Sequence, residues 1–344
     1  MSVAFYISGH GFGHASRSIE LINALVDRQS DLRVVVRSQV APWLFARTAA
    51  PSVELAPVQT DTGVVQIDSL RLDAAATISH AAEFMRTFGD RVSREVAFLR
   101  SVQARIVIAD LPPLGIAAAH AAGLPAIAFG NFTWDWIYDH YEGGDALART
   151  IGDIYSHTTA ALRLPMWGGF ETMTNVRDIP FVARHAHRDP DDTRLALGIP
   201  LGERVVLVSF GGYGLQGASK PQAPGYTVLW PGDVDEAAMY DKGYRYEDVV
   251  QAVDVVATKP GYGIISECVA NDTAVLYTSR GDFREYPVLV AEMPKYLRCG
   301  YIDHDDLFSG NWTPHLDRLL AQPSPPVRPA TNGAQIAADV VLNL

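Results

Sequence analysis

The sequence has few cysteines, few lysines and no long apolar run. Cys268 and Cys299 are the two cysteines among 344 residues, too few for a disulfide framework or a Cys-rich zinc site, so we expect a reducing cytoplasm. No stretch reaches the roughly 18 consecutive apolar residues that a membrane-spanning helix needs, so any membrane contact is expected to be peripheral. The first residues lack a basic segment before their glycine-rich turn, which disfavours a signal peptide.

Positive charge is also scarce. The chain has 28 Lys and Arg against 39 Asp and Glu, a formal net charge of −11, which disfavours a nucleic-acid duplex or an anionic membrane as partner. Hydrophobic residues make up 48% and charged residues 19%, a composition typical of folded rather than disordered chains. At roughly 100–200 residues per domain, the length predicts two domains.

Short β-branched runs alternate with helix-like segments, the pattern of parallel βαβ units. In the first half we expect strands over residues 3–8, 32–37, 106–109 and 125–129, and helices over 16–26 and 114–122. After a linker over 178–200, strands are expected over 204–210, 226–230, 254–257 and 274–278, and helices over 246–253 and 263–270. The sequence thus predicts an α/β fold with two Rossmann-like, doubly wound parallel-sheet domains facing a central cleft, over 1–180 and 181–328. Residues 329–344 are expected to form a helix that returns to the first domain.

A loop with three glycines and two histidines, Ser8–His14, joins the first expected strand to the first expected helix. Glycines let the backbone approach a ligand, and the helix start offers free N–H groups. A simple strand-to-helix turn accounts for Gly9 and Gly11, but it does not account for His10 and His14, which we expect to point into the cleft.

Two common nucleotide sites do not fit this loop. It lacks the Lys-Ser/Thr ending of a P-loop, and its G-x-G-x-G spacing differs from the G-x-G-x-x-G of dinucleotide-binding domains. The second strand ends in Arg37 and Ser38, where an NAD site would have an acid. A dehydrogenase is therefore a minor alternative.

The segment 258–267, TKPGYGIISE, again joins a strand to a helix. Gly261 and Gly263 can bring backbone N–H groups to a diphosphate at the helix start, and Lys259 can contact a phosphate. Glu267, one turn into the helix, is placed to accept hydrogen bonds from a ribose diol. The alternative for Glu267 is a solvated acid favoured near a helix N-terminus.

Two further segments follow strands of the second half. The loop Gly211–Gly214 and the segment 280–286, RGDFREY, stand where a sugar or phosphate would contact the second domain. Ordinary surface turns explain each glycine equally well. Loops of the first domain such as 61–77 are expected to form the acceptor surface.

In the first half, Asp110 ends a buried strand, IVIAD, and can orient a histidine across the cleft. The alternative for this carboxylate is a helix N-cap. The stretch 131–138, NFTWDWIY, is the densest in aromatic residues. Asn131 and Asp135 within it suit a sugar or acceptor platform, and the alternative is a packed helix face.

These motifs together resemble glycosyltransferases of the GT-B fold over nearly the whole chain. Residues 11–15, GFGHA, are similar to the glycine-rich loop and histidine of inverting enzymes related to MurG, and 259–267 to their donor-binding glycine–glutamate motif. The chain also resembles the glycosyltransferase-like N-terminal half of plant L-arabinokinases in GHGFGHA, NFTWDWIY, LGIP…SFGG and KPGYGIISE. The kinase half of those proteins has no counterpart here, so arabinose phosphorylation by this chain is not expected.

The resemblance implies an inverting, metal-independent glycosyltransferase. It would move a sugar from a nucleotide diphosphate sugar, with UDP the expected nucleotide, to a small-molecule or lipid-linked acceptor, without a separate cofactor. His14 is implied as general base or acceptor anchor and Asp110 as its partner. Glu267 is implied as the ribose ligand, and Glu285 stands where relatives contact the donor sugar.

The candidate residues fall into three groups. The catalytic pair is His14 and Asp110. The acceptor side comprises His10, Phe12, Asn131, Trp134 and Asp135. The donor side comprises Gly211, Gly212, Tyr213, Lys259, Gly261, Tyr262, Gly263, Ser266, Glu267, Arg284 and Glu285.

Two alternatives stay open at this point. One is a nucleotide-sugar 2-epimerase of the same fold, which would need extra acids near the anomeric and C2 positions. The other is a non-catalytic, nucleotide-sugar-binding regulatory protein. The oligomeric state is open as well.

Overall fold

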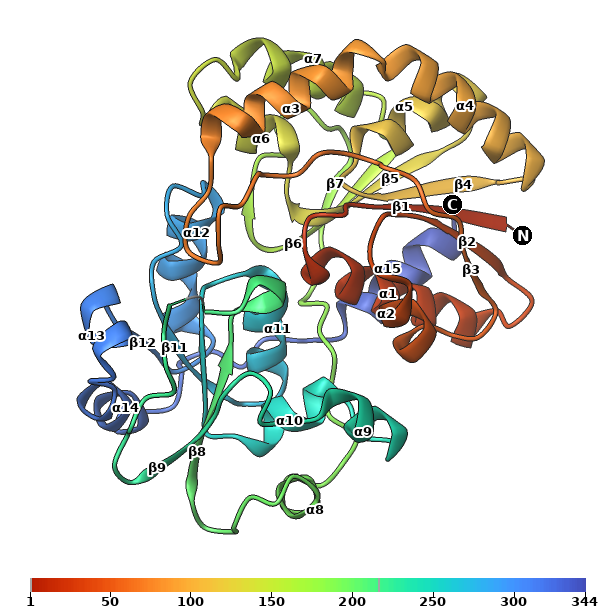
Figure 1. Cartoon of the computed structure of the whole chain (residues 1–344). Coiled ribbons are helices and arrows are strands. Elements are labelled where there is room, and N and C mark those ends of the chain that lie inside the picture. Colours follow the sequence, from red (N-terminus) through yellow and green to blue (C-terminus); the bar gives the residue numbers. More distant parts are fainter. Residues whose placement is uncertain (1, 216) are drawn as a thin grey trace.

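The computed structural model describes residues 2–215 and 217–344, except the side chain of Tyr213, and contains two parallel sheets (Figure 1). The first has seven strands in the order β3-β2-β1-β4-β5-β6-β7, and the second has five in the order β12-β11-β10-β8-β9. We call the part built on the seven-stranded sheet the first lobe and the part built on the five-stranded sheet the second lobe. No helix in the described part of the chain is long and apolar enough to cross a membrane.

The first sheet is buried at its centre. Strands β1, β4 and β5 are buried along their whole length, which explains why they read as continuous apolar runs. The strand order reverses between β1 and β4, and ligands of such sheets bind at this switch point. The strands are β1 Ser2–Ile7, β2 Arg33–Arg37, β3 Val53–Leu55, β4 Ile106–Asp110, β5 Ala126–Phe132, β6 Ala160–Gly168 and β7 Val176–Asp178.

Helices cover both faces of the first sheet (Figure 1). One face carries α1 Phe12–Arg28, α2 Pro42–Thr48 and α15 Gly333–Leu342. The other carries α3 Ala74–Arg86, α4 Phe88–Ser101, α5 Pro113–Ala122, α6 Trp134–Asp139 and α7 Asp145–Tyr155.

The second sheet repeats this plan on a smaller scale. Its strands are β8 Arg204–Ser209, β9 Tyr226–Leu229, β10 Val255–Thr258, β11 Ala274–Tyr277 and β12 Cys299–Tyr301. One face packs against α10 Tyr246–Ala252, α11 Tyr262–Ala270 and α12 Glu285–Glu292. The other packs against α13 His304–Ser309 and α14 Thr313–Leu320. The short helices α8 Pro190–Ala196 and α9 Glu236–Asp241 lie at the edge of this lobe (Figure 1).

The last helix returns to the first lobe, as the sequence predicts. Arg28 of α1 donates to Asp339 of α15 through Nε–Oδ1 at 2.5 Å. The backbone N–H of Gly333 donates to the carbonyl of Phe181 at 2.9 Å. A Cβ at position 333 would lie 2.2 Å from the carbonyl oxygen of Pro180, so only glycine fits this crossing.

A long loop, residues 57–73, reaches from the first lobe to the second; we call it the strap. The Ser69 hydroxyl donates to the carbonyls of Phe210 at 3.0 Å and Gly214 at 2.5 Å. Leu70 is buried in the apolar cluster of the second lobe. The tip of the strap thus docks on the second lobe, and the expected part of this loop in the acceptor surface stays a prediction.

The predicted strands and helices are present, with ends that differ by a few residues. The difference is largest at α1 and α15, whose first residues, Phe12 and Gly333, lie four residues from the expected starts. Strand β5 continues three residues beyond the expected end, to Phe132, and these residues are buried. Helices α3 and α4, the inner strand β6 and the edge strands β3, β7 and β12 were not predicted.

Candidate functional site

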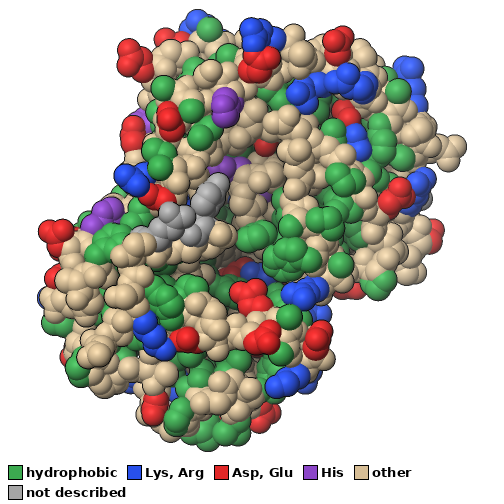
Figure 2. Space-filling model, in the orientation of Figure 1, with side chains coloured by type: hydrophobic (Ala, Val, Ile, Leu, Met, Phe, Trp, Pro, Cys, Tyr) green, Lys and Arg blue, Asp and Glu red, His purple; other side chains and the backbone are tan. Residues whose placement is uncertain are grey.

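The carboxyl ends of the two sheets meet at a hollow between the lobes, where histidine side chains are visible (Figure 2). His14 lies in the first turn of α1 and Asp110 is the last residue of β4. The His14 Nδ1 and Asp110 Oδ1 atoms are 2.9 Å apart, and both residues are buried. The chain turns sharply after Asp110, because Leu111 has a φ of 71°. The alternative that Asp110 caps the next helix is wrong, since Pro112 is the N-cap of α5.

A buried arginine holds this pair. Arg17 donates to Asp110 through Nε–Oδ2 at 2.8 Å and Nη2–Oδ1 at 2.5 Å, and Ser18 Oγ donates to Oδ2 at 2.9 Å. Burial opposes ionisation of Asp110, yet the positive charge of Arg17 and the hydrogen bonds lower its pKa to about 2. Arg17 was not among the candidates, although its spacing of three residues from His14 on one helix face was a usable signal.

The hydrogen bonds continue from Arg17 into the second lobe. Arg17 Nη1 donates to Asn131 Oδ1 at 2.6 Å, and Asn131 Nδ2 donates to Glu285 Oε1 at 2.7 Å. Glu285 begins α12, and its other oxygen lies 3.5 Å from Arg280 Nη1. Asn131, expected on the acceptor side, and Glu285, expected on the donor side, are thus direct partners.

A second carboxylate lies near the histidines. Asp61, in the strap, accepts hydrogen bonds from Ser8 Oγ at 3.1 Å and from Trp134 Nε1 at 3.0 Å. Both donors are neutral, and burial raises the pKa of Asp61 to about 6. Trp134 stacks on His14 with ring centroids 6.2 Å apart. Trp134 is fully buried, as the alternative of a packed helix face predicts.

Apolar side chains border Asp61 on its other side. A small pocket between the strap and helices α3, α6 and α7 brings the carboxylate together with Trp134 and Tyr138. Its remaining lining is mainly apolar, with Ala81, Phe84, Met85, Pro113, Leu147 and Ile151 beside Thr62.

His10 is held as a neutral imidazole. Its Nδ1 accepts the backbone N–H of Val64 at 3.3 Å, which leaves the proton on Nε2. Burial, and then the proximity of His14 and the positive charges of Arg280 and Lys259, lower the pKa of His10 to about 3. His10 therefore stays uncharged at neutral pH.

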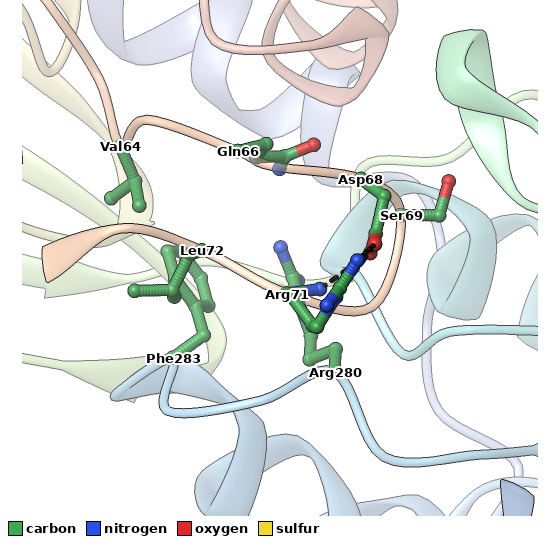
Figure 3. A pocket seen from close by; sticks show the side chains of 8 residues that line it. All are labelled: Val64, Gln66, Asp68, Ser69, Arg71, Leu72, Arg280 and Phe283. Atoms are coloured by element: carbon green, nitrogen blue, oxygen red, sulfur yellow. Dashed lines mark hydrogen bonds and ion pairs between the residues drawn. The ribbon is translucent and has the colours of Figure 1, made fainter.

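Two cations lie at the carboxyl edge of the second sheet, Lys259 after β10 and Arg280 after β11. Burial and the neighbouring charge of Arg280 lower the pKa of Lys259 to about 8, and its Nζ has Gln66 Oε1 of the strap at 3.5 Å. Arg280 donates to the carbonyl of Pro260 at 2.8 Å. Figure 3 shows the strap passing over Arg280 and Phe283. Only Glu285 is paired with either cation among the described residues, so this edge attracts anions.

The glycine loops of the two lobes touch at the cleft. A Cβ at Gly263 would lie 3.1 Å from the Cα of Gly13, and one at Gly212 would lie 3.7 Å from the ring of Phe12. Phe12 is 41% exposed, and Gly211 and Gly212 are exposed as well. The structure does not describe the side chain of Tyr213. Gly261 precedes α11 and offers no side chain to cap its N–H groups.

The structure buries Glu267 beside the interdomain linker. It is 4% exposed, so the alternative of a solvated acid is wrong. Its Oε1 accepts from Arg184 of the interdomain linker, from Nε at 2.7 Å and from Nη2 at 2.5 Å. A ribose would have to share or displace Arg184, and the ribose role of Glu267 stays a prediction.

Four other candidates also engage protein rather than open space. Tyr262 is buried, with the Arg17 guanidinium 5.4 Å above its ring, and Ser266 Oγ donates to the carbonyl of Gly263 at 2.9 Å. Asp135 turns away from the cleft and accepts from Thr172 at 3.1 Å. Arg284 reaches across to Asp139 of α6 at 3.2 Å.

Comparison with known proteins identifies the fold. No family model matches the chain. It is 30% identical to L-arabinokinase of Arabidopsis thaliana over 356 residues. This alignment covers 98% of this chain and 34% of that protein. The chain therefore spans about a third of the length of this relative.

Solved structures resemble nearly the whole chain. MurG from Acinetobacter baumannii has a TM-score of 0.52 at 10% identity, covering 100% of this chain and 99% of that one. The glycosyltransferase SnogD from Streptomyces nogalater has a TM-score of 0.55 at 16% identity, covering 100% of both. UGT71G1 of Medicago truncatula, complexed with UDP-glucose, has a TM-score of 0.58 at 11% identity, covering 99% and 94%. These likenesses confirm the predicted GT-B fold.

Proposed function

We propose that this chain, which has the GT-B fold, transfers a sugar with inversion from a UDP-sugar to an acceptor hydroxyl, without a metal ion. One observation carries the proposal: the buried His14–Asp110 pair, 2.9 Å apart, lies at the carboxyl edge of the first sheet. Lys259 and Arg280, which have only Glu285 as an acidic partner among the described residues, lie at the carboxyl edge of the second sheet. We expect the reaction to take place in the cytoplasm, on the ground of the two cysteines.

His14 is the base in this mechanism. With the Nδ1 proton directed to Asp110, Nε2 has a free lone pair and accepts the proton of the acceptor hydroxyl. The acceptor oxygen forms a bond to the anomeric carbon as the bond from that carbon to the diphosphate oxygen breaks. The electron pair leaves with the UDP, and attack on the face opposite the leaving group inverts the configuration.

The second lobe stabilises the leaving diphosphate. Lys259 and Arg280 supply positive charge, and the N-terminus of α11 after Gly261 supplies free backbone N–H groups. The strap covers this edge and would keep water from the donor. The acceptor approaches His14 from the first lobe.

Nucleotide binding tests the donor side first. Isothermal titration with UDP, GDP, ADP and dTDP should show one preferred nucleotide. Arg280→Gln should weaken its binding, whereas Arg204→Gln, at an exposed position of the same lobe, should not. Incubation with the matching sugar conjugates and an acceptor panel then tests transfer, with anomeric configuration read by NMR. If none of the four nucleotides binds, the proposal is contradicted.

A second candidate is a nucleotide-sugar 2-epimerase, favoured by Asp61. This reaction needs acids near the sugar besides the histidine, and Asp61, with a pKa raised by burial to about 6, lies close to His14. The two candidates separate in one assay. An epimerase yields the C2-inverted sugar nucleotide without an acceptor, and a transferase yields none.

A further inference from the structure

Arg17 lies between His14 and the second lobe, and the proposed reaction does not use it directly. We propose that Arg17 is a positioning residue that selects the tautomer of His14 according to whether α12 is docked on Asn131. The inference rests on the proposed function, because the tautomer of His14 matters only where Nε2 accepts a proton.

Two groups compete for one nitrogen of His14. Asp110 Oδ1 lies 2.9 Å from Nδ1, and Arg17 Nη2 lies 3.0 Å from the same Nδ1. A carboxylate only accepts and a guanidinium only donates, so the two contacts require opposite tautomers. With the proton on Nδ1, His14 donates to Asp110 and Nε2 is a free base. With Nδ1 accepting from Arg17, the proton lies on Nε2, which is then no base.

The position of Arg17 decides between these tautomers, and three contacts hold it. Nε and Nη2 are bonded to Asp110, and Nη1 is bonded to Asn131 at 2.6 Å. While the third contact exists, Nη2 lies closer to Asp110 Oδ1, at 2.5 Å, than to His14 Nδ1, at 3.0 Å, which favours the tautomer whose Nδ1 proton points to Asp110.

The third contact depends on the second lobe. Asn131 Nδ2 donates to Glu285 Oε1 at 2.7 Å, which fixes the Asn131 amide so that its oxygen faces Arg17. Without Glu285 the amide is free to turn and Arg17 Nη1 loses its acceptor. Nη2, which already lies 2.5 Å from Asp110 Oδ1 and 3.0 Å from His14 Nδ1, can then shift its hydrogen bond from the carboxylate toward Nδ1. Separation of α12 from Asn131 would thus switch off the base, and donor hydrolysis in an open cleft would be suppressed.

The test reads the tautomer of His14 directly and needs no substrate. In protein labelled with ¹⁵N-histidine, the two ring nitrogens of a neutral imidazole differ strongly in shift according to which carries the proton. His14→Gln identifies the signal. The other titratable or charged groups facing His14 are Asp110, Asp61 in the strap and His10, and they are unchanged in every variant below.

Wild type is expected to show the proton on Nδ1. Glu285→Ala and Asn131→Ala should each raise the Nε2-protonated population at least several-fold. Glu292→Ala, on the same helix but paired with Lys295 at the surface, is the matched control and should leave the signal unchanged. In an Arg17→Gln background, Glu285→Ala should have no further effect, because the link between them is gone.

Each outcome decides the proposal. If Glu285→Ala and Asn131→Ala leave the His14 tautomer as in wild type, Arg17 does not couple the lobes. An effect of Glu285→Ala that persists without Arg17 overturns it equally. Should Arg17→Gln fail to fold, the single variants Glu285→Ala and Asn131→Ala still decide. Because no nucleotide is present, a failed UDP titration refutes the proposed function without touching this result.

Discussion

The two edges that face the cleft differ in how completely their charges are matched. In the first lobe, Asp110 receives four hydrogen bonds from His14, Arg17 and Ser18. In the second, Arg184 serves both Glu267 at 2.5 Å and Glu247 at 3.4 Å, while Lys259 and Arg280 stand close together. Asp110 is thus fully paired without a ligand. In the second lobe two carboxylates share Arg184, and Lys259 and Arg280 have only Glu285 as an acidic partner among the described residues. From this difference we expect an anionic ligand to bind at the second lobe, near Lys259 and Arg280.

The largest effect on stability should come from removing the negative charge of Asp110 in the first lobe. Asp110→Asn leaves Arg17 buried with a neutral partner, which should cost about 3–5 kcal/mol of unfolding free energy. Urea unfolding followed by circular dichroism measures it. Asp178→Asn, which removes an exposed partner of Arg163, is the control and should cost less than 1 kcal/mol, as roughly expected for surface pairs. A loss as small as that of the control would mean that Asp110 does not balance Arg17.

The positive surplus of the second edge should appear in the pH dependence of UDP binding. The pKa of Lys259 is lowered to about 8, so its ammonium is charged below that pH and neutral above it. The affinity for UDP should therefore fall as the pH rises through 8, by about tenfold, the worth of one charge-assisted contact. Calorimetry at pH 7 and 9 tests this. Lys259→Arg should remove the dependence; if the fall persists, another group is responsible.

The excess of carboxylates around Arg184 should appear in the stability of the fold through Glu20, which lies on α1 of the first lobe near Glu247. Burial and the charge of Glu247 raise the pKa of Glu20 to about 7 from an ordinary 4.5, so the fold favours its protonated form. That stabilisation is present below pH 4.5 and is lost as the pH rises through 7. Glu20→Gln should therefore raise stability by about 1 kcal/mol above pH 7 and leave it unchanged below 4.5. Denaturation across this range measures it, with exposed Glu171→Gln as control; equal effects at both pH values would contradict the assignment.

The smallest expected effect, that of Glu267→Gln in the second lobe, gives the sharpest comparison with Asp110→Asn in the first. Glu267→Gln leaves Glu247 as the one carboxylate paired with Arg184, and the amide oxygen of the new glutamine can still accept a hydrogen bond from Arg184. We therefore expect a change below about 1 kcal/mol, against several for Asp110→Asn. Parallel urea titrations of the two variants compare them. A comparable loss for both would show that the second edge is as tightly matched as the first.

Much of the fold could be predicted from the sequence, because its central strands are apolar runs that end in polar turns. The positions of His14 and Asp110 followed from the same logic, since residues at the carboxyl ends of neighbouring parallel strands converge. Their catalytic role stays a prediction.

Arg17, Arg184 and Asp61 escaped prediction for a different reason. Their importance depends on partners 93, 83 and 73 residues away in the chain. Arg17 has one local signal, its spacing of three residues from His14, but no local pattern marks the pairings of Arg184 and Asp61. The strap was equally hidden, because a loop with little periodicity gives no sign of the lobe on which it docks.

The strap also has a mechanical consequence. The chain crosses between the lobes through the linker and again before α15, where Val182 and Asn332 form a bridge. The strap ties the lobes at another point, through Ser69 and Leu70, and Figure 1 shows it well apart from those crossings. A body attached at separated points resists rotation. Opening the cleft about the linker must therefore break the hydrogen bonds of Ser69 to Phe210 and Gly214 or bend the strap itself.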